Sequence, residues 1–187
     1  MQRSRRSDRL ICVPLILAFL FCILTGCSSG ASEPSASAAS SGIDSFTGGY
    51  DYEAPVSVLV YEPVEGEDEC GIQYRAVTDV DGLIASDNKI MFYFYNSMAT
   101  ELLGITAGVE DMAQACWGDM YVVVVDVMED PELSARYSIN SVPEFVVVRG
   151  GDEISRFEGY NYEEWSLDDV VSWLEGCGTK FDYTRLQ

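Results

Sequence analysis

The sequence predicts an α/β domain with a mixed sheet, and three observations support this prediction. Residues 121–127 (YVVVVDV) are rich in β-branched side chains, which is typical of a strand buried on both faces beneath helices. Asp130 and Pro131 are the residue types that favour a helix start, as N-cap and first helical residue. Residues 149–152 (RGGD) separate two strand-like segments, which indicates an antiparallel hairpin. Together, a buried strand beneath helices and a hairpin indicate a mixed sheet.

The expected order of elements is ββαβαβαββα. Strands are predicted from apolar or alternating runs at residues 55–61, 72–78, 90–95, 121–127, 145–148 and 153–157. Helices are predicted at residues 78–85, from about 99 to 116, from 130 onward, and from 166 to about 176. Before the last helix, Ser166 with Asp169 resembles a capping box, and Trp165 with Val170 can form a hydrophobic staple.

Residues 1–26 have the features of an export signal. Four arginines precede fifteen uncharged residues from Leu10 to Leu24, a run too short to span a bilayer. The next residues, Thr25-Gly26-Cys27, complete a pattern that resembles the lipobox of bacterial lipoproteins. That resemblance implies cleavage before Cys27, acylation of its thiol, and a lipid anchor on the extracytoplasmic face of the cell membrane. An uncleaved membrane anchor is the alternative.

Residues 27–54 are interpreted as a flexible tether. Most of this segment is Ser, Ala and Gly without apolar periodicity, which is a linker composition. About 25 such residues reach roughly 25–30 Å on average. The predicted domains are therefore a signal peptide at 1–26, a tether at 27–54 and one folded domain at 55–187.

Charge and composition exclude several functions. The chain has 11 Lys and Arg against 31 Asp and Glu, a net charge of −20, which argues against a nucleic-acid partner. It has no histidine, which removes Ser-His-Asp and Cys-His activation and every His-ligated metal site. We assign no catalytic residue, cofactor or metal to the chain.

Two acidic segments are weak candidates for cation binding. Residues 79–82 (DVDG) resemble the start of a calcium loop but lack its later oxygen ligands, so helix capping is the better interpretation. Residues 65–69 (EGEDE) could collect cations, although such a run is usually a solvated loop. A surface cation-binding protein stays open as an alternative function.

Residues 74–177 resemble a thioredoxin domain. The resemblance rests on Val125-Asp126-Val127, Pro131-Glu132-Leu133, Ser141-Val142-Pro143, Gly150-Gly151 and the neighbouring aromatic residues. It implies a thioredoxin-like three-layer α/β/α sandwich, with residues 56–69 supplying an extra N-terminal strand. It also implies a cis bond before Pro143, at a loop where the backbone of Val142 would meet an extended partner segment.

The sequence departs from this family where the family places its redox chemistry. Aligned on Phe94-Tyr95, the two cysteine positions hold Ala99 and Leu102, after Met98. The family's buried acid falls on Tyr93, and its lysine falls on Val124. Disulfide exchange needs an attacking thiolate and a resolving thiol, which alanine and leucine cannot supply.

Cys70, Cys116 and Cys177 are the remaining cysteines of the chain after Cys27. None of their spacings is C-x-x-C, and structural roles are favoured over catalytic ones. In the thioredoxin fold the second and last helices lie on one face and run the same way. Since Cys116 and Cys177 end these helices, the resemblance implies that they pair in a disulfide.

The sequence therefore predicts a membrane-tethered, redox-inactive thioredoxin-like lipoprotein that acts as a binding or adaptor module for a protein or peptide of the cell envelope. The candidate partner-binding residues are Met98, Ala99, Val142, Pro143, Gly159 and Tyr160. The alternative from another class is a thiol-disulfide oxidoreductase of the cell envelope that uses noncanonical cysteines or a partner's thiol.

Overall fold

The computed structural model describes residues 42–66, 69–99, 103–158 and 164–186. Within them, seven strands form one sheet in the order β1-β3-β2-β5-β4-β6-β7. The strands are β1 (Thr47–Tyr50), β2 (Val56–Pro63), β3 (Cys70–Val77), β4 (Ile90–Tyr95), β5 (Tyr121–Asp126), β6 (Glu144–Arg149) and β7 (Asp152–Glu158). The helices are α2 (Val80–Ala85), α3 (Leu103–Cys116), α4 (Pro131–Arg136), α5 (Leu167–Gly176) and the 3₁₀ helix η3 (Tyr183–Arg185).

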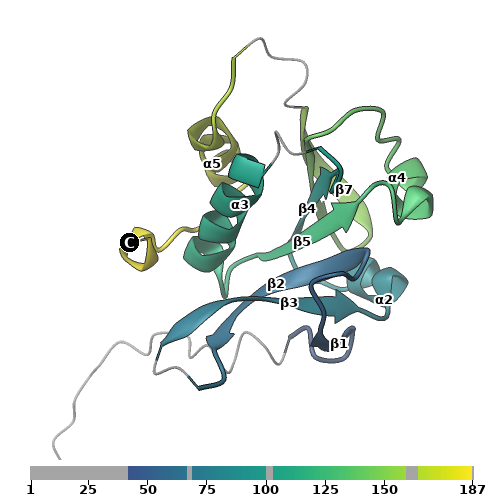
Figure 1. Ribbon diagram of the computed structural model, residues 1–187. Helices are drawn as coiled ribbons and strands as arrows, with labels where there is room; N and C mark the ends of the chain where they lie inside the picture. The colour runs from purple at the N-terminus through teal and green to yellow at the C-terminus, as the bar shows by residue number, and fades with distance from the viewer. Residues whose placement is uncertain (1–41, 67–68, 100–102, 159–163, 187) are drawn as a thin grey trace, which may run out of the picture. The chain divides into compact units, whose positions relative to one another are not determined.

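The sheet is mixed and has helices on both faces, so the predicted α/β sandwich is confirmed. β4 and β5 run parallel, whereas the other neighbouring strands pair antiparallel. Figure 1 shows α3 and α5 on one side of the sheet and α2 and α4 on the other. Each side buries its own cluster of apolar side chains: Val109 and Val170 belong to the first, and Leu83 and Leu133 to the second.

The predicted helix starts are confirmed by their hydrogen bonds. The Asp79 carboxylate accepts from the Gly82 N–H at 2.8 Å, and the Asp130 carboxylate accepts from the Leu133 N–H at 2.8 Å. At α5 the Ser166 N–H donates to Asp169 at 2.8 Å, the returning half of the capping box. The bonds from Gly82 and Leu133 satisfy backbone N–H groups of the first turn, which have no acceptor within the helix, and the bond from Ser166 fixes the start of α5.

The segment before residue 55 departs from the predicted tether. Residues 47–50 form β1, which pairs with β3, and Ile43 is fully buried in the α2/α4 cluster. The sequence offers little indication of this strand because β1 has four residues, two of which are glycine. At Gly48 a Cβ would lie 3.1 Å from the Thr78 Cγ2, a tight contact that glycine avoids. The folded part therefore extends to about residue 42.

The extra N-terminal strand lies inside the sheet. β2 is antiparallel to β3 along one edge and to β5 along the other, with Val58 opposite both Arg75 and Val123. Its residues 56–60 are all buried, which explains why this run is apolar except at Ser57. β2 thus lies between β3 and β5, where it completes the centre of the sheet.

Among the described residues, none of the helices combines the length and apolar character that a membrane crossing requires.

Candidate functional site

Three segments meet at one edge of the sheet, which we call the cis-proline edge: residues 96–99, 127–129 and 142–143. β4 and β5 are parallel and end together, with Tyr95 opposite Asp126. β6 runs the other way and begins at Glu144, opposite Phe94. The residues that follow β4 and β5 and precede β6 are therefore neighbours, although up to 47 positions separate them in the sequence.

Asp126 holds two of these segments together. Its side chain is 4% exposed, and its Oδ1 accepts from the Met128 N–H at 3.0 Å and the Ser97 N–H at 3.5 Å. Asn96 shapes the first segment, because its Oδ1 accepts from the Met98 N–H at 2.8 Å and its carbonyl accepts from the Ala99 N–H at 3.0 Å. These bonds within the chain hold both loops in place.

The edge presents apolar side chains to solvent. Met98 is 80% exposed and Met128 is 60% exposed, and Ala99 and Val142 are half-buried. Pro143 is buried, and the Val142–Pro143 peptide bond is cis, as predicted. Methionine is flexible and polarisable, so it can adapt to varied partner surfaces. The arrangement is suited to contact with another chain.

Three residues that the sequence analysis named lie outside the described residues: Leu102, Gly159 and Tyr160.

Comparison with known proteins identifies the family of the region that contains the cis-proline edge. Residues 76–172, slightly more than half of the chain, match the thioredoxin family. The chain belongs to the thioredoxin family. The matched region begins at the end of β3, so β1, β2 and most of β3 precede it.

Similar proteins include named thioredoxins, and the chain spans less than two thirds of the length of the first of them. The chain is 26% identical over 106 residues to Thioredoxin-T of Drosophila melanogaster, covering 57% of this chain and 62% of that protein. It is 22% identical over 77 residues to thioredoxin of Chlorobaculum thiosulfatiphilum, covering 41% of this chain and 71% of that protein. Among solved structures, oxidised mitochondrial thioredoxin 3 of Saccharomyces cerevisiae has 19% identity and a TM-score of 0.44, covering 51% of this chain and 84% of that one.

The thioredoxin domain has no cysteine between the end of β4 and Cys116, the last residue of α3. α3 is 14 residues long, so Cys116 lies roughly 20 Å from the residues that begin the helix. Cys70 lies opposite Pro63, the last residue of β2. The first residue of β2, Val56, lies opposite Val125 near the cis-proline edge, and the seven residue steps between the two ends of β2 span roughly 23 Å. Both thiols are therefore remote from the cis-proline edge.

Cys116 is placed as a core residue. It is 1% exposed, and its Sγ lies 3.8 Å from the carbonyl oxygens of both Ala113 and Met120. Burial raises the pKa of this thiol to about 12, so at neutral pH it is protonated and a poor nucleophile.

The expected Cys116–Cys177 disulfide is not present in the structure. Cys70, Cys116 and Cys177 are all free thiols. Cys116 and Cys177 do pack in the same cluster, as the ends of neighbouring helices should. The Cys116 Sγ, however, makes its polar contacts within its own turn and the following loop, so its thiol is accommodated without a bridge.

Tyr93 lies where the alignment with the family places an acid. It is fully buried, stacks on Phe145 with ring centroids 5.1 Å apart, and its hydroxyl is 3.4 Å from the Thr106 Oγ1. Burial raises the pKa of its phenol to about 12. The group is therefore neutral at physiological pH. Val124, on the lysine position, is likewise buried and uncharged.

A buried acid that sequence reasoning missed follows Pro143. Glu144 is 1% exposed and forms an ion pair with Arg156, while its Oε2 has no hydrogen-bond partner. Burial raises its pKa, and Arg156 opposes this effect. Arg156 also binds the Glu153 carboxylate and the Tyr137 carbonyl. The sequence feature that could have indicated this buried acid is the position of Glu144 directly before the apolar run 145–148.

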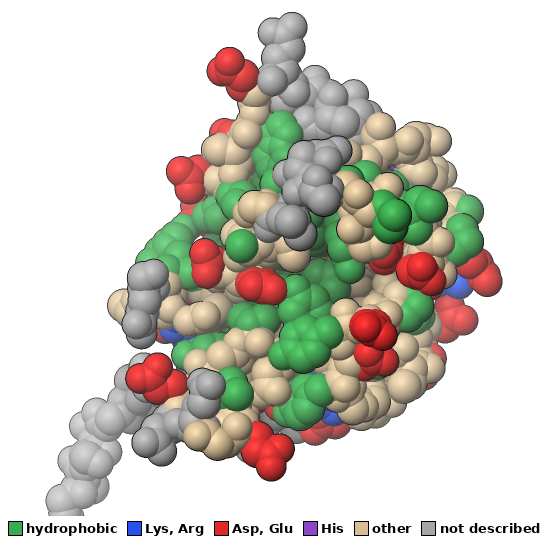
Figure 2. All heavy atoms as spheres, viewed as in Figure 1, with side chains coloured by type: hydrophobic (Ala, Val, Ile, Leu, Met, Phe, Trp, Pro, Cys, Tyr) green, Lys and Arg blue, Asp and Glu red, His purple; other side chains and the backbone are tan. Residues whose placement is uncertain are grey.

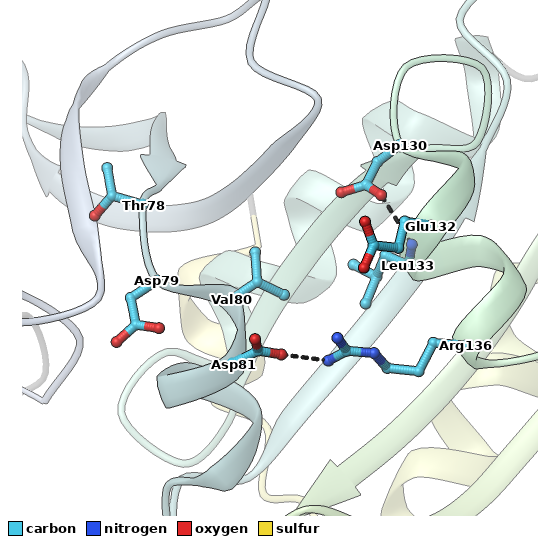
Figure 3. A pocket seen from close by; sticks show the side chains of 8 residues that line it. All are labelled: Thr78, Asp79, Val80, Asp81, Asp130, Glu132, Leu133 and Arg136. Atoms are coloured by element: carbon cyan, nitrogen blue, oxygen red, sulfur yellow. Dashed lines mark hydrogen bonds and ion pairs between the residues drawn. The ribbon is translucent and has the colours of Figure 1, made fainter.

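An acidic pocket of about 320 Å³ lies between α2 and α4 (Figure 3). Three of its four carboxylates have partners: Asp79 and Asp130 cap the two helices, and Asp81 forms an ion pair with Arg136 at 2.6 Å. In the described ranges, no group of three or more acidic or cysteine side chains is arranged to hold a metal ion. The capping interpretation of residues 79–82 is thus confirmed, and residues 67 and 68 of the acidic loop lie outside the description.

Proposed function

We propose that this chain is a membrane-tethered, extracytoplasmic binding or adaptor module that holds an extended segment of a protein partner at the cis-proline edge. The observation that carries the proposal is the cis Val142–Pro143 bond beside exposed Met98 and Met128, at an edge without a described thiol. In thioredoxins this edge receives an extended substrate, and here the same loop geometry is present without a cysteine beside it.

The edge supplies both kinds of contact that an extended segment needs. Backbone groups next to a cis-proline can pair with the backbone of a bound strand, and nearby side chains then select its residues. Met98 and Met128 would supply adaptable apolar contacts. Asp126 and Asn96 fix the loops in advance, which lowers the entropy cost of binding.

Absence of thiol-disulfide catalysis is part of the proposal. Exchange requires a reactive thiolate near the bound disulfide. Cys116 is buried with a raised pKa, and Cys70 lies at the far end of β2. Cys177 packs in the same cluster as Cys116, and the carbonyl of the next residue, Gly178, accepts from Lys89, which precedes β4. A partner would therefore be bound and released unchanged.

The membrane tether rests on the N-terminal sequence. The apolar run, the small residue before Cys27 and the linker composition that follows support an acylated anchor with a reach of roughly 25–30 Å. The acidic body would be repelled by anionic headgroups, so the domain stands away from the membrane surface.

In-cell crosslinking followed by purification from membranes tests this function. Met98→Asp places a charge on the edge and should reduce the captured partner severalfold. Ile154→Asp is the matched control, because Ile154 is 55% exposed on β7 near the β6–β7 turn. Equal capture by wild type and both variants would contradict the proposed site. Turnover of a disulfide substrate that is lost in a Cys70/Cys116/Cys177 triple-alanine variant would instead support the oxidoreductase alternative.

A further inference from the structure

Three tyrosines form a second surface beside the cis-proline edge, and we call Tyr52, Tyr74 and Tyr95 the tyrosine surface. Tyr52 is 68% exposed, and its ring centroid lies 5.1 Å from that of Tyr74. Tyr95, at the end of β4, is half-buried, and it packs against the same apolar cluster as Tyr74. The surface therefore continues from the β1–β2 connection to Tyr95, the residue just before the cis-proline edge begins at Asn96.

The N-terminal extension supplies most of this surface. Tyr52 and Tyr74 precede residue 76, where the match to the thioredoxin family begins. The Asp51 N–H donates to the Tyr74 carbonyl at 3.0 Å, which holds the Tyr52 loop against β3. The tyrosine surface is thus an addition to the family's domain.

The charges around the three rings are negative. The Tyr74 hydroxyl donates to the Glu110 carboxylate on α3 at 2.6 Å. Exposed Asp51 and Glu53 flank Tyr52 in the sequence. The pKa of Tyr95 is raised by burial and by the charge of Asp126. The tyrosine hydroxyls and rings therefore lie in a field that favours a cation.

Six of the seven basic side chains of the described residues are engaged elsewhere. Arg75, Lys89, Arg136, Arg156 and Arg185 have carboxylate partners, and Arg149 binds the Asp87 carbonyl, whereas Lys180 is exposed. In this part of the chain, the one cation placed over a ring is Arg185, over Tyr61. Figure 2 shows Asp and Glu around exposed hydrophobic side chains on the viewed face, with few Lys or Arg.

We propose that the tyrosine surface binds a lysine or arginine side chain of the same extended partner segment that lies at the cis-proline edge. This inference rests on the proposed function and specifies the chemistry of the partner. A cation over a tyrosine face is stabilised by the ring quadrupole, and the adjoining carboxylates add charge complementarity. The chain, with a net charge of −20, would also attract a basic segment from a distance.

Fluorescence anisotropy with the full-length chain in detergent tests the proposal. The probes are a labelled peptide that alternates lysine and serine and a matched peptide that alternates glutamate and serine. Only the lysine peptide should bind, and Tyr52→Leu should weaken its binding about two- to fivefold, as expected for an exposed cation–π contact. Tyr52→Phe, which keeps the ring, should bind as wild type does.

Tyr183→Leu is the matched control, because Tyr183 is 53% exposed on η3 and its hydroxyl binds Glu175. This variant should bind as wild type does. The double variant Asp51→Asn, Glu53→Gln should also weaken binding severalfold at low salt. Equal loss in the Tyr52 and Tyr183 variants, no loss in either, or equal binding of both peptides would overturn the proposal.

The two proposals can fail separately. If Met98→Asp reduces in-cell capture of the partner while Tyr52→Leu does not, and the peptides fail as described, the binding function remains and its cationic specificity is overturned. If Met98→Asp leaves capture unchanged, the proposed function fails whatever the peptides show.

Discussion

Gly108 on α3 faces Leu167 on α5 so closely that a Cβ added at Gly108 would lie 2.0 Å from the Leu167 Cδ1. Real side chains do not approach to this distance, so the absence of a side chain at position 108 lets the two helices pack together on the sheet. Gly104, one turn earlier in α3, has no atom within 4 Å of the same added Cβ.

Gly108→Ala is expected to destabilise the domain, although alanine is the better helix former. The overpacking cost of about 1–3 kcal/mol opposes the helix gain of about 1 kcal/mol, so the free energy of unfolding should fall by up to about 2 kcal/mol. Gly104→Ala is the control and should leave stability unchanged or raise it by up to about 1 kcal/mol. Urea denaturation measures both, and a Gly108→Ala variant as stable as the control would contradict this packing.

Glu144→Gln should remove a pH dependence of stability. The pKa of Glu144 in the folded protein is raised above its ordinary value of 4.5, so the folded state holds this proton more tightly than the unfolded chain. Its contribution to stability is therefore greatest at low pH and falls as pH rises from about 4.5 through the raised pKa. Denaturation curves across this pH range should show the stability of wild type falling relative to the variant. The opposite trend would mean that the ion pair with Arg156 dominates over burial.

The thiols should differ in reactivity. Cys70 is exposed and should react with a thiol reagent in the native protein, whereas Cys116 should react only after denaturation. With a pKa of about 12, about one Cys116 thiol in 10⁴ is ionised at pH 8, in addition to its burial. Mass spectrometry of labelled peptides measures this. If Cys116 and Cys177 both react only after denaturation and reduction together, while Cys70 reacts in the native protein, the Cys116–Cys177 disulfide exists after all.

Cys27→Ala should detach the protein from the membrane or leave its signal segment uncut. The reason is that acylation of this thiol is the expected anchor, and each buried CH₂ contributes about 0.8 kcal/mol. Fractionation and intact-mass measurement compare the variant with wild type, and Cys22→Ala serves as the control within the apolar run. A mature wild-type protein without acyl mass, or with another N-terminus, would disprove the lipobox.

The elements predicted best are those with short-range signals. Asp79, Asp130 and Ser166 determine helix starts through bonds to residues three positions away, and such patterns are visible in the sequence. The cis bond before Pro143 was also predicted, through the resemblance of its loop to the thioredoxin family.

What escaped prediction depends on contacts between distant residues. The short strand β1 is stabilised by β3, and Ile43 is buried only because the sheet and α2 are in place. Glu144 is buried because Arg156 crosses to it from β7. Composition alone indicates a flexible segment before residue 55 and an exposed side chain at Glu144. Tertiary contacts make the end of this segment ordered and bury Glu144.

The interior position of β2 has a consequence for the order in which the domain can form. β2 and β3 are close in the sequence and can form a hairpin early, but the second partner of β2 is β5, about 65 residues later, with Val58 opposite Val123. Pairings of such separation are slow to form. Until β5 arrives, the nascent chain presents an apolar strand with an unpaired edge, which is the kind of surface that chaperones protect.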